Sequence, residues 1–117
     1  MKRSILLTVL SLVAACSGTA RGPLPPIADM LPSDVREAEP EFDRRVKANF
    51  PVGTSESDAI SKLRSFGFEV KPWGTDRYRS ADITRGDIIC QTIWSVRWRA
   101  EGGVLREVFG VYGHRCP

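Results

Sequence analysis

Few residues in this chain have side chains suited to covalent or metal chemistry. The set consists of three cysteines and one histidine: Cys16, Cys90, Cys116 and His114. Thiol catalysis needs a histidine that an acid orients, and His114 does stand two residues before Cys116. A disulfide between Cys90 and Cys116 would remove that nucleophile. A zinc site would need a fourth ligand and usually shows CxxC spacing, which is missing here. We therefore expect no catalytic residues, no metal site and no cofactor.

The first fifteen residues have the layout of a secretory signal peptide. Lys2 and Arg3 form a positive start, residues 5–13 are mainly apolar, and small residues follow. The apolar run is shorter than the ~20 residues that a membrane-spanning helix needs. Residues 1–15 are therefore expected to direct export and to be removed.

The four residues Val13-Ala14-Ala15-Cys16 resemble the lipobox of bacterial lipoproteins. In that family the thiol receives a diacylglycerol, cleavage occurs just before the cysteine, and the new N-terminus is acylated, for example with palmitate. Ser17 stands where an Asp tends to retain such proteins in the inner membrane. The resemblance therefore implies a stable lipid anchor at Cys16 in the outer membrane, facing the periplasm. The alternative is an ordinary signal peptide that ends near a cysteine.

The charge of the chain gives little support for binding nucleic acid. The full sequence carries 17 basic and 14 acidic residues. Without Lys2 and Arg3 the basic count falls to 15, which leaves a net charge near +1. Bulk binding to nucleic acid needs a strong basic excess, so this class of partner is not expected.

Residues 16–40 are predicted to be the lipidated N-terminus and a proline-rich tether. Five of the eight prolines fall in this stretch: Pro23, Pro25, Pro26, Pro32 and Pro40. Such a composition favours polyproline II, at about 3.1 Å per residue, so some 20 residues would reach roughly 60 Å. The folded domain is then expected to span residues 41–117.

Two helices are predicted at the start of that domain. Pro40 suits the first turn of a helix in which Phe42, Val46 and Phe50 form one apolar stripe. A second helix follows Thr54 or Ser55 as its N-cap, with Ala59, Ile60, Leu63 and Phe66 on its buried side. Gly67 can close that helix in the left-handed conformation.

Strand patterns occupy the rest of the chain. Residues 68–70 begin a strand, and residues 77–84 form another with poor alternation. The strongest pattern is that of a β-hairpin. Apolar and polar residues alternate over residues 88–98, Gly102-Gly103 can form the turn, and residues 104–112 form the second strand. The order α-α-β-β-β predicts an α+β fold. It has two N-terminal helices packed on a three-stranded antiparallel sheet that ends in a long C-terminal β-hairpin.

A disulfide between Cys90 and Cys116 would also set the register of the hairpin. Once Cys16 is acylated, these two cysteines are the only thiols left, and the periplasm is oxidising. Placing them opposite each other sets Trp94 against Tyr112, Trp98 against Val108 and Arg99 against Glu107. These apolar and opposite-charge pairs are what a stable ladder favours. The alternative is a pair of separately buried thiols.

The hairpin is expected to have one apolar and one basic face. Trp94, Trp98 and Tyr112 are interpreted as core that faces the helices, with a ligand-binding aromatic surface as the alternative. Arg97 and Arg99 lie on the opposite face, with Arg77 and Arg79 upstream. These four arginines are the candidate partner-binding residues, suited to an acidic protein surface. The alternative is a solvated sheet face.

The second helix carries a family resemblance. The segment Gly53-Thr54-Ser55-x-x-Asp58-Ala59-x-x-x-Leu63-x-x-x-Gly67 resembles a motif of small lipoproteins in the SmpA/OmlA-like family. That family has two helices on a three-stranded antiparallel sheet, a fold shared with secreted β-lactamase inhibitor proteins. The resemblance implies a non-enzymatic envelope lipoprotein, a membrane-tethered protein-interaction module that supports outer-membrane assembly or integrity.

The shared inhibitor fold leaves a second function open. A tethered inhibitor of a periplasmic or incoming hydrolase would present a rigid loop to the enzyme. Trp73-Gly74-Thr75-Asp76 is the only candidate for such a loop.

Overall fold

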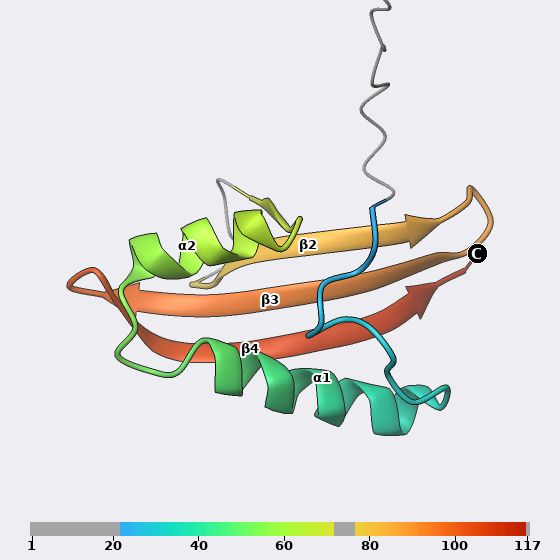
Figure 1. Ribbon diagram of the computed structural model, residues 1–117, viewed down its shortest axis with the longest axis horizontal. Helices are drawn as coiled ribbons and strands as arrows, with labels where there is room; N and C mark the ends of the chain where they lie inside the picture. The colour runs from blue at the N-terminus through green and yellow to red at the C-terminus, as the bar shows by residue number, and fades with distance from the viewer. Residues whose placement is uncertain (1–21, 72–76, 117) are drawn as a thin grey trace, which may run out of the picture.

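A computed structural model describes residues 22–71 and 77–116, which form one antiparallel sheet with two helices. The elements in chain order are α1 (Val35–Asn49), α2 (Glu56–Ser65), β1 (Glu69–Val70), β2 (Arg79–Gly86), β3 (Gln91–Glu101) and β4 (Val104–Arg115). The strands lie in the order β1-β2-β3-β4, and every neighbouring pair is antiparallel. Both helices lie on the same side of the sheet (Figure 1). The predicted α+β class, with two helices and an antiparallel sheet, is confirmed.

The sheet has four strands, so the prediction of three is wrong. The four strands correspond to the four strand patterns of the sequence, so only their total was miscounted. The pattern at residues 68–70 forms β1, in which Glu69 pairs with Asp82 and Val70 with Ala81. Their pairing depends on β2, which is more than eight residues away along the chain.

Helix α1 begins earlier than the sequence suggested. Asp34 is its N-cap and accepts a hydrogen bond from the Arg36 amide at 2.9 Å. Pro40 lies inside the helix, not in its first turn. The N-cap of α2 agrees with the prediction, because Ser55 Oγ accepts from the Asp58 amide at 3.4 Å.

Residues 22–34, here called the N-terminal strap, are packed against the domain and do not form a free tether. Ile27 and Ala28 are 3% and 2% exposed within the hydrophobic core. An Arg45 Nη atom on α1 donates to the carbonyl oxygen of Asp29 at 2.6 Å and to that of Pro26 at 3.2 Å. The folded part therefore starts well before residue 41. The sequence did not predict this start, because the prolines interrupt any helical or strand period in the apolar residues between them.

The core lies between the sheet and the helices, as the apolar stripes predicted. Its α1 and α2 side chains are Phe42, Val46, Phe50, Ala59 and Leu63, and β3 contributes Trp94, Val96 and Trp98. Trp98 is 1% exposed, and its indole Nε1 donates to Glu56 Oε2 on α2 at 2.8 Å. This bond satisfies the one polar atom of a buried tryptophan. The interpretation of Trp94 and Trp98 as core is confirmed, and Tyr112 packs against it partly buried.

The hairpin of β3 and β4 has the predicted register. Trp94 pairs with Tyr112, Trp98 with Val108 and Arg99 with Glu107. The predicted disulfide between Cys90 and Cys116 is present just beyond the last pair of the ladder. At the other end, Gly102 and Gly103 have φ angles of 59° and 77°. A two-residue hairpin turn with positive φ at both positions suits glycine, which has no Cβ to clash.

Candidate functional site

The register divides the sheet into two faces with different surroundings. On β3 the even-numbered side chains from Trp94 to Trp98 point toward the helices, which makes this the covered face. Among residues 22–71 and 77–116, no helix or strand packs on the other side, which we call the open face. The open face carries side chains from the last three strands and from Tyr78, which directly precedes β2. They include Ser80 and Asp82 on β2, Ile93, Ser95, Arg97 and Arg99 on β3, and Glu107, Phe109, Val111, Gly113 and Arg115 on β4.

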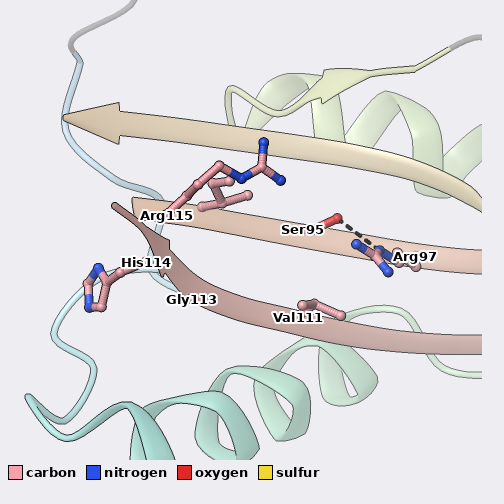
Figure 2. Close-up of a pocket in the computed structure, with 7 residues that line it drawn as sticks. Ser95, Arg97, Val111, Gly113, His114 and Arg115 are labelled. Atoms are coloured by element: carbon pink, nitrogen blue, oxygen red, sulfur yellow. Dashed lines mark hydrogen bonds between the residues drawn. The ribbon is translucent and has the colours of Figure 1, made fainter. Parts of the chain in front are cut away.

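A shallow pocket of about 200 Å³ lies on the open face between β3 and β4. Figure 2 shows Arg97 and Arg115 extending over the sheet, with Ser95 between them and Val111 nearby. Ile93 also lines the pocket. Two guanidinium groups thus flank a floor that is partly apolar, an arrangement suited to a carboxylate next to an apolar group.

Arg97 is a basic residue of this pocket with a single side-chain partner within the described ranges. It is exposed, and its Nε donates only a long hydrogen bond of 3.4 Å to Ser95 Oγ. It makes no ion pair with any acid of the described ranges. Ser95 itself is 3% exposed, although it lies on the open face. The Arg97 charge is therefore free to meet an anionic group of a binding partner.

Arg99 lies on the same face but is already paired. Its Nη1 contacts Glu101 Oε1 at 2.7 Å, and its Nε lies 3.7 Å from Glu107 Oε2. Tyr78 joins this network by donating its hydroxyl proton to Glu107 Oε1 at 2.9 Å. That hydrogen bond raises the pKa of Tyr78 above its ordinary value, and the partial burial of the phenol and the Glu107 charge act in the same direction. The Arg99 charge is therefore neutralised by Glu101 and Glu107, and these contacts help to order the open face.

The four predicted arginines do not form one patch. Arg97 and Arg99 share the open face, but Arg79 lies on the covered face, opposite Trp98, and its Nη1 contacts Glu56 Oε1 at 3.2 Å. Arg77 is exposed just before β2. The alternation of residues 77–84 was too poor to show from the sequence which of their side chains face the helices. Arg115 was missed, although counting in twos from Arg97 along the predicted register would have placed it on the same face.

The described ranges contain no free thiol that could take part in thiol catalysis or bind zinc. Cys90 and Cys116 are joined in the disulfide, so neither offers a thiolate to zinc or to a substrate. His114 is one of the residues that line the pocket, but Figure 2 shows its ring pointing away from the other labelled side chains. Its Nδ1 lies 3.0 Å from Oγ1 of Thr92, its cross-strand partner. Residues 22–71 and 77–116 contain no group of three or more potential metal ligands.

Three predicted features lie outside the described residues: the signal peptide of residues 1–15, the lipidation site Cys16 and the candidate inhibitor loop Trp73-Gly74-Thr75-Asp76. None of the described helices is both long enough and apolar enough to cross a bilayer. Comparison of the chain with protein-family models, with curated proteins and with solved structures finds no match.

Proposed function

We propose that this protein is a non-enzymatic envelope lipoprotein that is anchored through Cys16 to the outer membrane and faces the periplasm. It works as a membrane-tethered protein-interaction module and supports outer-membrane assembly or integrity. The observation that carries this proposal is the open face of the sheet, where Arg97 and Arg115 flank a partly apolar pocket. The resemblance of residues 53–67 to the SmpA/OmlA-like family agrees with it.

The chemistry of the open face favours a protein partner with an acidic surface. An arginine fork binds a carboxylate through two parallel hydrogen bonds, and the half-buried side chains of Phe109 and Val111 supply adjoining apolar contact. Charged groups at the edge of such a contact set specificity and association rate more than affinity. A lipid anchor would add to the affinity by raising the effective concentration of the module at the membrane.

Site-specific photo-crosslinking in living cells tests this proposal. A photoreactive amino acid at Val111, on the open face, should form an adduct with one envelope protein. The matched control places it at Val52, which is 61% exposed in the connection between α1 and α2. Mass spectrometry of the adduct then identifies the partner.

Charge variants decide whether the arginine takes part. Arg97→Glu should abolish the adduct at Val111, and Arg97→Lys, which keeps the charge, should retain part of it. Cys16→Ser should lose both labelled palmitate and the adduct. Equal adducts at Val111 and Val52 would overturn the open face as a binding site, and an unchanged adduct in Arg97→Glu would show that Arg97 does not take part in the binding. An adduct with a single soluble hydrolase would favour the inhibitor function.

A further inference from the structure

The loop between β2 and β3 exposes two adjacent large apolar side chains. Ile88 is 99% exposed and Ile89 is 67% exposed. Isolated apolar residues on a surface need no explanation, but adjoining ones at the tip of a loop are characteristic of contact with a protein or a membrane.

This loop is held in shape by its own bonds. Asp87 Oδ1 accepts hydrogen bonds from the Ile89 and Cys90 amides at 2.8 and 2.9 Å. These bonds lower the pKa of the Asp87 carboxyl below its ordinary value, so its oxygen serves the backbone turn. Cys90 is joined to Cys116, which ties the loop to the end of β4. The two isoleucines are therefore presented on a short, stapled tip.

The chain enters the folded part beside this loop. The Gly22 carbonyl oxygen accepts a hydrogen bond from Arg85 Nη2 at 3.3 Å, and Arg85 lies two residues before Asp87. Figure 1 shows the start of the N-terminal strap, the β2–β3 loop and the end of β4 at the same end of the sheet. The connection between α1 and α2 and the β3–β4 turn lie at the opposite end.

Chain length limits how far this end can lie from an anchor at Cys16. Only residues 17–21 separate Cys16 from Gly22, and a fully extended chain spans at most about 3.6 Å per residue, so the reach is roughly 20 Å. A tether that extended to residue 40 would have allowed about three times that distance. The packing of the N-terminal strap therefore keeps the β2–β3 loop near the membrane surface.

We infer that the end of the domain formed by the β2–β3 loop docks on the bilayer that holds the anchor. Ile88 and Ile89 enter the boundary between headgroups and acyl chains, and Arg85 and the exposed Arg115 meet lipid phosphates. This inference rests on the proposed lipidation of Cys16. The docked end orients the sheet so that the open face stands beside the membrane and stays accessible to a partner.

Quenching by brominated lipids tests the inference on the full acylated protein. The protein is reconstituted in phosphatidylethanolamine–phosphatidylglycerol vesicles whose acyl chains carry bromine, and the wild-type signal is subtracted. Ile88→Trp adds a fluorophore at the loop tip, and Val52→Trp adds one at an exposed position in the α1–α2 connection. We expect the brominated chains to reduce the added fluorescence at position 88 about twofold and to leave that at position 52 unchanged.

Flotation of the vesicles separates failure of the docking from failure of the anchor. If both variants float and their added fluorescence is quenched equally, the docking inference is wrong while the anchored function stands. If neither variant floats with the vesicles, both the anchor and the docking are wrong. Quenching confined to Ile88→Trp supports the docking.

Discussion

Gly110 and Gly113 lie three residues apart on β4 but on opposite faces of the sheet, and their surroundings differ sharply. A Cβ atom added at Gly110 would lie 2.9 Å from Phe42 Cδ1 and 3.0 Å from Val46 Cγ2. A Cβ atom added at Gly113 would meet nothing within 4 Å. The covered face is thus packed so closely against α1 that α1 would have to shift to accommodate one added methyl group. The open face at Gly113 has space for an added group.

This contrast indicates that the covered face contributes most of the packing that stabilises the domain, while the proposed binding is assigned to the open face. Side chains on the covered face are constrained by one another, because protein interiors are close-packed. Side chains on the open face are constrained mainly by a few polar contacts, such as that of Tyr78 with Glu107. Changes there can alter binding without unfolding the domain.

The largest expected effect comes from truncating an aromatic residue on each face. Phe42 is 0% exposed, and Phe42→Ala should lower the free energy of unfolding by about 3–5 kcal/mol because it leaves a cavity in the core. Phe109 lies on the open face and makes an edge contact with Tyr78 at 5.2 Å between ring centroids. Phe109→Ala should cost only about 1 kcal/mol. Chemical denaturation of the two variants measures both values, and equal losses would contradict the division between the faces.

A smaller effect should come from adding one methyl group to each glycine. Gly110→Ala should lower the free energy of unfolding by about 1–3 kcal/mol, because α1 must shift to make room. That shift would also strain the hydrogen bond from the Gly110 amide to Asp43 Oδ1, now 2.9 Å. Gly113→Ala should stay within about 0.5 kcal/mol of wild type. A Gly113→Ala protein that melts as early as Gly110→Ala would show that the open face is packed in solution.

The smallest expected effect concerns Glu41 on α1, where Arg44 and Arg45 donate hydrogen bonds to the carboxylate. These bonds lower the pKa of Glu41 to about 2, below the ordinary value of 4.5. A carboxyl with a depressed pKa stabilises the folded state above its unfolded pKa and loses this contribution as the pH falls toward the folded value. Glu41→Gln should therefore melt slightly below wild type at pH 7, and the difference should shrink between about pH 4.5 and 2. An identical difference in melting temperature at pH 7 and pH 2.5 would count against this pairing.

The sequence alone predicted those parts of the fold that depend on local periodicity. Phe42, Val46 and Phe50 recur every four residues, so the buried side of α1 could be read directly. The hairpin register followed from period-two alternation together with the expected pairing of Cys90 with Cys116. Arg97 and Arg99 could be assigned to the same face for this reason.

Other features depended on contacts between distant segments. The packing of the N-terminal strap could not be predicted from the sequence, because Ile27 and Ala28 are core residues only through contact with distant segments. One such contact is the hydrogen bond from Arg45 on α1 to the carbonyl oxygen of Asp29. The face on which Arg79 lies could not be predicted from the sequence, because it depends on the register between β2 and β3, which no turn motif specified.

The amino-acid sequence by itself thus determined the helical stripes, the hairpin and its disulfide, because each follows from the spacing of residues within one continuous segment. Only the tertiary structure decided which sheet face remains open, which arginines form ion pairs, and how close the folded part begins to Cys16. These properties depend on how α1, α2 and the strap pack on one side of the sheet. Burial of apolar surface drives that packing. Because the hydrophobic effect is non-directional, the spacing of apolar residues does not show which distant segments will pack together.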